Sequence, residues 1–208
     1  MPRPRLRAAS FAAFPLAAAA LAAAGCASAS LPPPADVAQR AGAARSYSGR
    51  LRVSLRGPDM RGRTAALLGF RRPDGLRIEI PGPTGARLVA VAHGEALTAV
   101  FPAERAVFRG EATAAGLEDL LGVALSPSEV MDLLVGTPSP RVRDYRVRWG
   151  PSVPRELQAT LPDGGRLKVT VESATLDPDL PDAAFAEPAS EGYRAVEAAE
   201  ARRLWGAR

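Results

Sequence analysis

The fold is decided by the stretch Arg50-Leu51-Arg52-Val53-Ser54-Leu55-Arg56, in which apolar and polar side chains alternate. A period of two is typical of a β-strand that buries one face and leaves the other in water. Leu51, Val53 and Leu55 therefore share the buried face, and the arginines share the wet one. The stretch predicts a half-buried strand of an antiparallel sheet.

Five more strands are expected directly after it, joined by short turns. They are expected at Arg63 to Arg71, Leu76 to Ile80, Arg87 to Ala92, Ala96 to Phe101 and Arg105 to Arg109. The turns are rich in Gly, Pro and Asp, as in Gly57-Pro58-Asp59 and Pro73-Asp74-Gly75. Strands at this spacing predict an antiparallel meander.

The period then changes to 3.6, which predicts two short helices at Gly116 to Leu121 and Ser126 to Val135. Ser126-Pro127-Ser128-Glu129 supplies an N-cap, a proline in the first turn and a capping-box acid. Gly136 is expected to end the second helix.

Strand patterns return after the helices. Three apolar faces are expected, made of Tyr145, Val147 and Trp149; of Leu157, Ala159 and Leu161; and of Leu167, Val169 and Val171. Phe185 is expected to make a last edge contact. Asp36 to Arg45 reads as a short helix, and Tyr193 to Trp205 as a terminal helix or, alternatively, a loosely packed tail. The predicted class is α+β, mainly β: one curved sheet of about 9–11 strands interrupted by a helical pair.

The N-terminus predicts export and lipidation. Arg3, Arg5 and Arg7 precede an alanine-rich apolar run that ends in Leu21-Ala22-Ala23-Ala24-Gly25-Cys26, which contains the only cysteine. This layout is typical of a signal peptide, and small residues before a cysteine resemble a bacterial lipobox. Cleavage before Cys26 would leave a diacylglyceryl cysteine carrying acyl chains such as palmitate. An ordinary secretory signal is the alternative. The apolar run is too short for a stable transmembrane helix, so an anchored rather than spanning protein is expected.

Charge and composition point away from nucleic acid. Three of the +5 formal charges belong to the signal arginines, which leaves about +2 for the rest of the chain. The aromatic residues do not alternate with basic ones as a stacking platform requires. No nucleic-acid partner is expected, although a basic exported protein fits anionic lipid headgroups.

Few residues fit catalysis. His93 is the only histidine and lies in a predicted turn, where an exposed loop role is favoured over a general base. Neither a phosphate-binding loop nor a nucleophile elbow is present. The prolines between Asp177, Asp179 and Asp182 favour a surface loop over a calcium site. We expect no enzyme, no catalytic residues, no metal and no cofactor.

The remaining candidates for a functional role are the apolar side chains, which form either a packed core or a cavity between a curved sheet and a helical lid. Short helices and many alanines favour the cavity. The candidate cavity residues are Leu51, Val53, Leu55, Leu68, Phe70, Ile78, Ile80, Leu97, Phe101, Phe108, Leu120, Leu121, Met131, Leu133, Leu134, Tyr145 and Trp149.

The order of these pieces resembles the LolA/LolB superfamily of lipoprotein carriers and receptors, over roughly residues 45–175. Tyr47 to Leu51 looks like the opening strand of that family, and Leu76 to Val91 looks like the third strand, loop and fourth strand of LolB. Val130 to Pro138 is similar to the LolB helix and its glycine-proline stop. Because LolA is soluble, the lipobox and tether favour LolB.

The resemblance implies an incomplete antiparallel β-barrel that holds acyl chains without a covalent reaction. It implies a lipid-anchored receptor on the periplasmic side of the outer membrane, a monomer that accepts lipoproteins from a LolA-like periplasmic carrier. The LolB loop that carries a protruding leucine corresponds here to Pro83, Thr84 and Gly85. Threonine is a poor membrane probe, so the delivery step is where this chain departs from the family.

The expected organisation is therefore a signal peptide at 1–25, a lipidated end and tether at 26–35, a half-barrel domain at 36–190 with a lid at about 115–136, and a C-terminal helix or tail at 191–208. The alternative function is a structural or partner-binding, sensor-type periplasmic lipoprotein with the same fold and a filled core. An unrecognised hydrolase that uses His93 is the third hypothesis.

Overall fold

The computed structural model describes residues 35–57 and 61–205. The predicted signal peptide, Cys26 and nearly all of the tether lie outside the described residues, as do Pro58 and Asp59 of the first turn.

The described residues form one ten-stranded sheet with the order β10-β6-β5-β4-β3-β2-β1-β9-β8-β7. The strands are β1 Ser46–Arg56, β2 Arg61–Arg71, β3 Gly75–Gly82, β4 Gly85–His93, β5 Ala96–Phe101, β6 Ala106–Glu111, β7 Arg143–Trp149, β8 Pro154–Thr160, β9 Arg166–Leu176 and β10 Arg194–Ala195. Strands β1 to β6 pair antiparallel in chain order, so the predicted meander is confirmed. The sheet has two free ends, β10 and β7, and the predicted open, mainly β architecture is confirmed.

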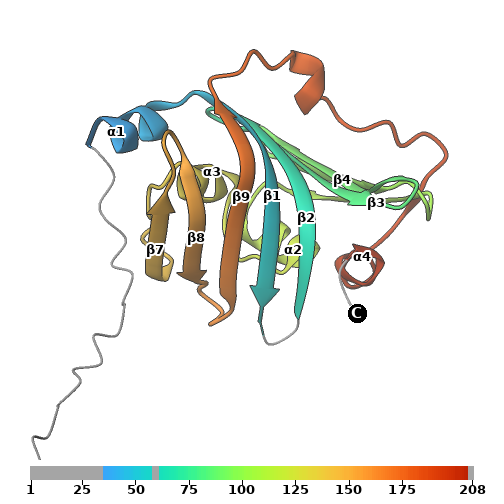
Figure 1. Cartoon of the computed structure of the whole chain (residues 1–208). Helices are drawn as coiled ribbons and strands as arrows, with labels where there is room; N and C mark the ends of the chain where they lie inside the picture. Colours follow the sequence, from blue (N-terminus) through green and yellow to red (C-terminus); the bar gives the residue numbers. More distant parts are fainter. Residues whose placement is uncertain (1–34, 58–60, 206–208) are drawn as a thin grey trace, which may run out of the picture.

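The sheet is strongly curved, and helices lie on one side of it (Figure 1). The helices are α1 Ala35–Ala43, α2 Ala114–Leu121, α3 Pro127–Leu134 and α4 Ala198–Trp205, with a 3-10 turn, η1, at Asp182–Phe185. In Figure 1, α2 and α3 lie behind β9, β1 and β2, whose front face carries no helix. The sheet therefore has a concave, covered face. Among the described residues, the opposite face is uncovered except where the 178–185 segment packs on it, near Arg71 and β3.

Strand β1 is central because it pairs with β2 on one side and with β9 on the other. Leu51 and Leu55 are 1% and 5% exposed, whereas the arginines between and beside them are exposed. This alternation places the core on the concave face, as predicted.

Helix α3 begins and ends where the sequence predicts. Ser126 accepts a hydrogen bond from the Glu129 backbone, the Glu129 carboxylate accepts one from the Ser126 backbone, and Pro127 occupies the first turn. Gly136 follows the helix with φ +86°, in the left-handed region that glycine tolerates. Trp149 lies so close to Gly136 that a Cβ would collide with its ring.

The terminal helix predicted at Tyr193 to Trp205 is wrong in its first half. The Arg194 and Val196 amides donate to Arg105 O and Val107 O, both at 2.9 Å, and β10 pairs parallel with β6. The edge of β6 offers unpaired backbone groups, and they hold this segment extended until α4 begins.

Two predictions differ in extent. Strand β1 begins at Ser46 rather than Arg50, because Tyr47 packs fully buried and stacked on Phe70, with ring centroids 5.4 Å apart. Phe185 makes its contact with inner strands instead of a sheet edge: it is buried in η1, which packs against β3 and β4, and the Arg71 guanidinium lies 5.1 Å from its ring centre.

Among the described residues, no helix combines the length and apolar character that crossing a membrane requires.

We predict that Gly49→Ala destabilises the fold by about 1–3 kcal/mol, because a Cβ there would lie 2.6 Å from the Tyr47 hydroxyl and 2.8 Å from its ring. The matched control is Gly69→Ala on β2, whose Cβ would meet only ordinary contacts of 3.7 Å or more. This control is expected to be neutral or slightly stabilising, since alanine suits a strand better than glycine. Denaturant unfolding measures both; equal effects at the two positions would contradict the packing of Tyr47 over Gly49.

Candidate functional site

An apolar cavity lies between the concave face of the sheet and the segments that cover it, with a volume of about 120 Å³. Its size is close to that of the ~150 Å³ apolar protein cavities that stay dry and take up one benzene. The described cavity therefore has room for a small apolar group.

The lining comes from six strands of the sheet, β1, β2, β3, β7, β8 and β9, and from the helical cover. The sheet contributes Leu51, Val53, Leu55, Thr64, Ala66, Leu68, Ile78, Ile80, Tyr145, Leu157, Gln158, Ala159, Leu167 and Val169. The cover contributes Leu117, Leu121, Val123, Leu125, Val130, Leu133, Leu134 and Trp205. No side chain of this lining carries a charge at neutral pH, so the cavity suits an apolar ligand.

The hydroxyl group of Tyr145 is the polar group of the lining whose surroundings fix its hydrogen bond and its protonation state. The Tyr145 hydroxyl donates to Leu133 O at 3.0 Å, which ties β7 to α3. Burial raises the pKa of Tyr145, so the phenol stays neutral at physiological pH.

Helix α4 closes one side of the cavity. The Trp205 indole N–H donates to Leu120 O at 2.6 Å, and Arg202 donates to Asp119 O at 2.8 Å. These contacts satisfy carbonyl groups at the C-terminal end of α2 and place a cation there, where the helix dipole favours one. The ring of Trp205 is thereby held against the cavity.

The structure brings together part of the candidate set predicted from the sequence. The candidates that line the cavity are Leu51, Val53, Leu55, Leu68, Ile78, Ile80, Leu121, Leu133, Leu134 and Tyr145. The others lie outside the lining and pack in the surrounding core: Phe70, Leu97, Phe101, Phe108, Leu120, Met131 and Trp149. Leu97, Phe101 and Phe108 come from β5 and β6, which contribute no residue to the lining, whereas the other four lie on elements that do contribute.

On the cover, sequence reasoning missed Trp205 as a cavity residue, and also Leu117, Val123, Leu125 and Val130. On the sheet it missed Thr64, Ala66, Leu157, Gln158, Ala159, Leu167 and Val169. For Leu117 and Val130 the signal was their place on the apolar stripes of the predicted helices. Trp205 gave no such signal, because only the tertiary docking of α4 on α2 brings it to the cavity.

The Pro83, Thr84 and Gly85 segment forms a tight hairpin tip. Gly82 pairs with Gly85, so Pro83 and Thr84 are the two turn residues, and all three predicted loop residues are exposed. Just beyond the tip, the Arg87 guanidinium donates to Leu204 O at 3.3 Å. The hairpin therefore lies beside the end of α4.

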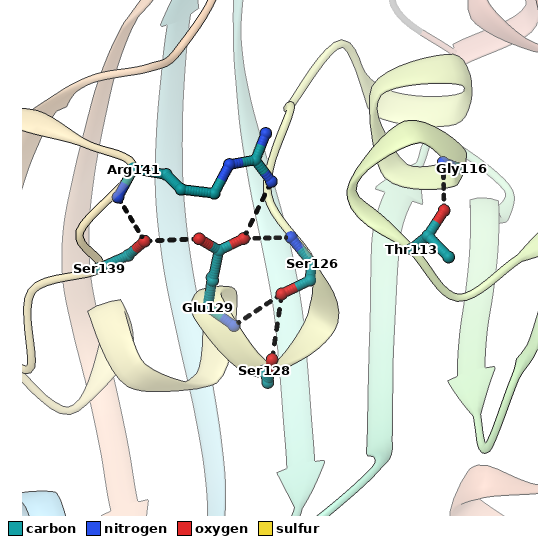
Figure 2. Close-up of polar contacts among 7 residues, drawn as sticks. All are labelled: Thr113, Gly116, Ser126, Ser128, Glu129, Ser139 and Arg141. Atoms are coloured by element: carbon teal, nitrogen blue, oxygen red, sulfur yellow. Dashed lines mark hydrogen bonds and ion pairs between the residues drawn. The ribbon is translucent and has the colours of Figure 1, made fainter.

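The most connected polar cluster outside the cavity surrounds Glu129 at the start of α3 (Figure 2). Its carboxylate accepts hydrogen bonds from Ser139 Oγ at 2.6 Å and from the Ser126 amide at 2.8 Å, and Arg141 lies at 3.4 Å. Burial pushes the pKa of Glu129 upward, but these hydrogen bonds and the charge of Arg141 together lower it below its ordinary value. Every group of the cluster is engaged in capping α3 and holding the loop that follows it.

The remaining residues considered for catalysis or metal binding are His93 and the acidic side chains. His93 ends β4 opposite Ala96 and is exposed. Within residues 35–57 and 61–205, no group of three or more His, Cys, Asp or Glu side chains is placed to hold a metal ion.

A curved open sheet with an apolar cavity under short helices defines a fold suited to binding apolar ligands. Among solved structures, the chain is similar to a LolA superfamily protein from Nitrosomonas europaea, with a TM-score of 0.40 and 11% identity over 73% of this chain and 96% of that chain. No family model matches the sequence. A comparison with curated proteins found no match.

We predict that Glu129→Gln flattens the acid limb of the stability profile. The folded-state pKa of Glu129 lies below its ordinary value, so the unfolded chain binds the proton more tightly. The stabilisation is then complete above the ordinary value of 4.5 and is lost as pH falls through the folded-state pKa.

At neutral pH, the free energy of unfolding of Glu129→Gln should be roughly 1 kcal/mol lower than that of the parent. On acidification, it should fall less than that of the parent. Ser139→Ala, which keeps the carboxylate and removes one donor, should fall between the two. Urea unfolding between pH 7 and pH 3 measures the profiles, and parallel curves for parent and Glu129→Gln would contradict the prediction.

Proposed function

We propose that this protein binds acyl chains of lipoproteins in the apolar cavity and acts as a receptor in lipoprotein localisation to the outer membrane, as LolB does. The observation that carries the proposal is the cavity itself, which is lined by uncharged, almost entirely aliphatic side chains from the concave face and the helical cover. Such a lining favours hydrocarbon over any polar ligand.

The free energy gained for each buried methylene group indicates how long a bound acyl chain must be. Each buried CH2 contributes about 0.8 kcal/mol, so a chain of several methylenes is needed for useful affinity. A cavity of about 120 Å³ accepts only part of such a chain. Uptake of more requires the cover to move outward, and α2, α3 and α4 have only eight residues each.

The closing contacts of α4 are suited to such movement. The Arg202–Asp119 ion pair is partly exposed and contributes little to stability, and the Trp205 hydrogen bond can exchange for one to water. Opening therefore loses few polar interactions, and the apolar contacts of α4 around the fully buried Ala201 are the ones that a bound acyl chain would replace.

The membrane steps rest on the predicted anchor. Acyl chains on Cys26 would hold the domain on the periplasmic side of the outer membrane, and residues 27–34 would act as a tether of about 30 Å at full extension. A LolA-like carrier would supply the cargo. The exposed Pro83-Thr84-Gly85 hairpin is the proposed delivery loop, with threonine in place of a leucine.

A second candidate is a sensor-type lipoprotein that binds a partner protein instead of cargo. The observation that favours it is the packing of one end of the concave face, where Phe70 and Phe101 are fully buried and Phe108 is 6% exposed. That end is a filled core, so the open space is confined to the other end.

The proposal predicts that filling the cavity blocks binding. Ala66 lines the cavity and Ala65, its neighbour on β2, is exposed on the opposite face, so the pair gives a matched test. In a Cys26→Ala background, Ala66→Met should weaken binding of a fluorescent fatty acid at least tenfold, while Ala65→Met should leave it unchanged. Fluorescence titration measures both, and thermal unfolding checks that both variants fold.

Equal affinities for the two variants, or no saturable binding by the parent chain, would contradict the proposed acyl site. A parent chain that binds the probe but receives no lipoprotein from a LolA-like carrier would keep the acyl site and overturn the receptor role.

A further inference from the structure

The uncovered face of the sheet carries three consecutive rows of side chains, fixed by the strand register. Across β7, β8, β9, β1 and β2 the rows are Arg143-Thr160-Arg166-Arg56-Arg61, then Arg146-Gln158-Lys168-Ser54-Arg63, then Arg148-Glu156-Thr170-Arg52-Ala65. We call these residues the basic face. Each row holds several cations, and only the third holds a carboxylate.

Apart from Gln158, which also borders the cavity, the basic face points away from the cavity. Val53, Leu55 and Leu167, which alternate with its members, line the cavity on the other side of the sheet. Its Arg and Lys side chains are all exposed. Figure 1 shows β8, β9, β1 and β2 side by side in front, with α2 and α3 behind them.

Few of these cations are neutralised. Arg52 pairs with Glu172 at 2.5 Å, and Lys168 pairs with Glu156 at 2.9 Å. Within the described ranges, no other cation of the basic face forms an ion pair. Asp59, in the loop between Arg56 and Arg61, lies outside those ranges.

Two other carboxylates, Asp144 and Asp163, lie close in sequence to members of the first row, and each accepts a hydrogen bond. Asp144 accepts a hydrogen bond from Thr160 Oγ1 at 3.0 Å, and Asp163 accepts one from the Gly165 amide at 2.9 Å. In the first row, the strand register places Arg166, Arg56 and Arg61 directly opposite one another on adjacent strands. Like charges in that arrangement repel and destabilise a sheet.

The form of the basic face indicates the kind of partner. Its rows contain no aromatic residue on which a nucleic-acid base could stack. The charges extend over five adjacent strands instead of converging on one point, which suits a surface with many separate anions. Basic residues near a layer of anionic lipid are attracted to it, and the attraction is screened by salt.

We propose that the basic face binds the surface of a bilayer that contains anionic phospholipid. The contact would orient the domain with the uncovered face of the sheet against the headgroups and leave the helical cover accessible. It is independent of acyl binding, because the basic face and the cavity occupy opposite sides of the sheet.

The test uses the full chain with Cys26→Ala, so that no acyl anchor forms. Flotation with vesicles of phosphatidylcholine plus phosphatidylglycerol measures binding, and pure phosphatidylcholine vesicles measure any insertion by the N-terminal segment. The test variant replaces Arg56, Arg61, Arg63 and Arg166 with Gln. The control variant makes the same change of net charge elsewhere, by replacing Arg40, Arg45, Arg105 and Arg203 with Gln.

The parent and the control variant should prefer anionic vesicles at low salt and lose that preference at high salt. The test variant should bind anionic vesicles on the order of 1,000-fold more weakly than the parent, given the usual attraction per basic residue. Its fatty-acid binding should be unchanged, which also shows that it folds.

Equal losses in the two variants would overturn the proposal in favour of net charge alone. A parent with no preference for anionic vesicles would overturn it as well, and would leave an acidic protein as the partner of this face.

Discussion

The structure depends on the register of β1 between β2 and β9. Because side chains alternate along a strand, the pairing that points Leu51, Val53 and Leu55 into the concave side also points Arg52 and Arg56 to the other side. A slip of one residue would exchange the two sets and place arginines in the core. One register therefore defines both the apolar cavity and the basic face.

The helical cover is held at its ends more than along its length. Glu129 and its hydrogen-bond donors fix the start of α3, and Trp205 and Arg202 fix the end of α2. Between these points, the residues of the cover contact the cavity through apolar side chains such as Leu121, Val123 and Leu125. Such contacts have no preferred direction, so a cover of this kind can shift without losing many specific interactions.

Much of the fold follows from local sequence patterns. The alternation in β1 predicts its buried face, β5 has the predicted bounds, and Ser126 with Glu129 predicts the start of α3. The pairing of β10 with β6 could not be predicted from the sequence. Tyr193 to Trp205 has a helical pattern, and the strand with which Arg194 pairs is distant in sequence. The alternating pattern alone also did not predict the early start of β1, since Ser48 and Gly49 carry no apolar signal.

The candidate site was predictable only in part. An inward-facing residue is identified by periodicity, but whether it meets a void or a neighbour depends on close packing along the whole sheet. Leu133 meets the cavity, whereas Met131, two residues earlier on the same helix, is fully buried in the core. The contribution of Trp205 depends on the docking of α4, which leaves no local pattern.

The central claim, that the cavity takes up an acyl chain, is tested most directly by the fluorescence of Trp205. The chain has two tryptophans, and Trp149→Phe leaves Trp205, a cavity residue, as the only one. Titration of the Cys26→Ala, Trp149→Phe chain with a fatty acid brominated along its tail should quench this fluorescence saturably, at one molecule per chain. The unbrominated fatty acid should compete. Absence of quenching, or quenching that rises without saturation, would contradict the account.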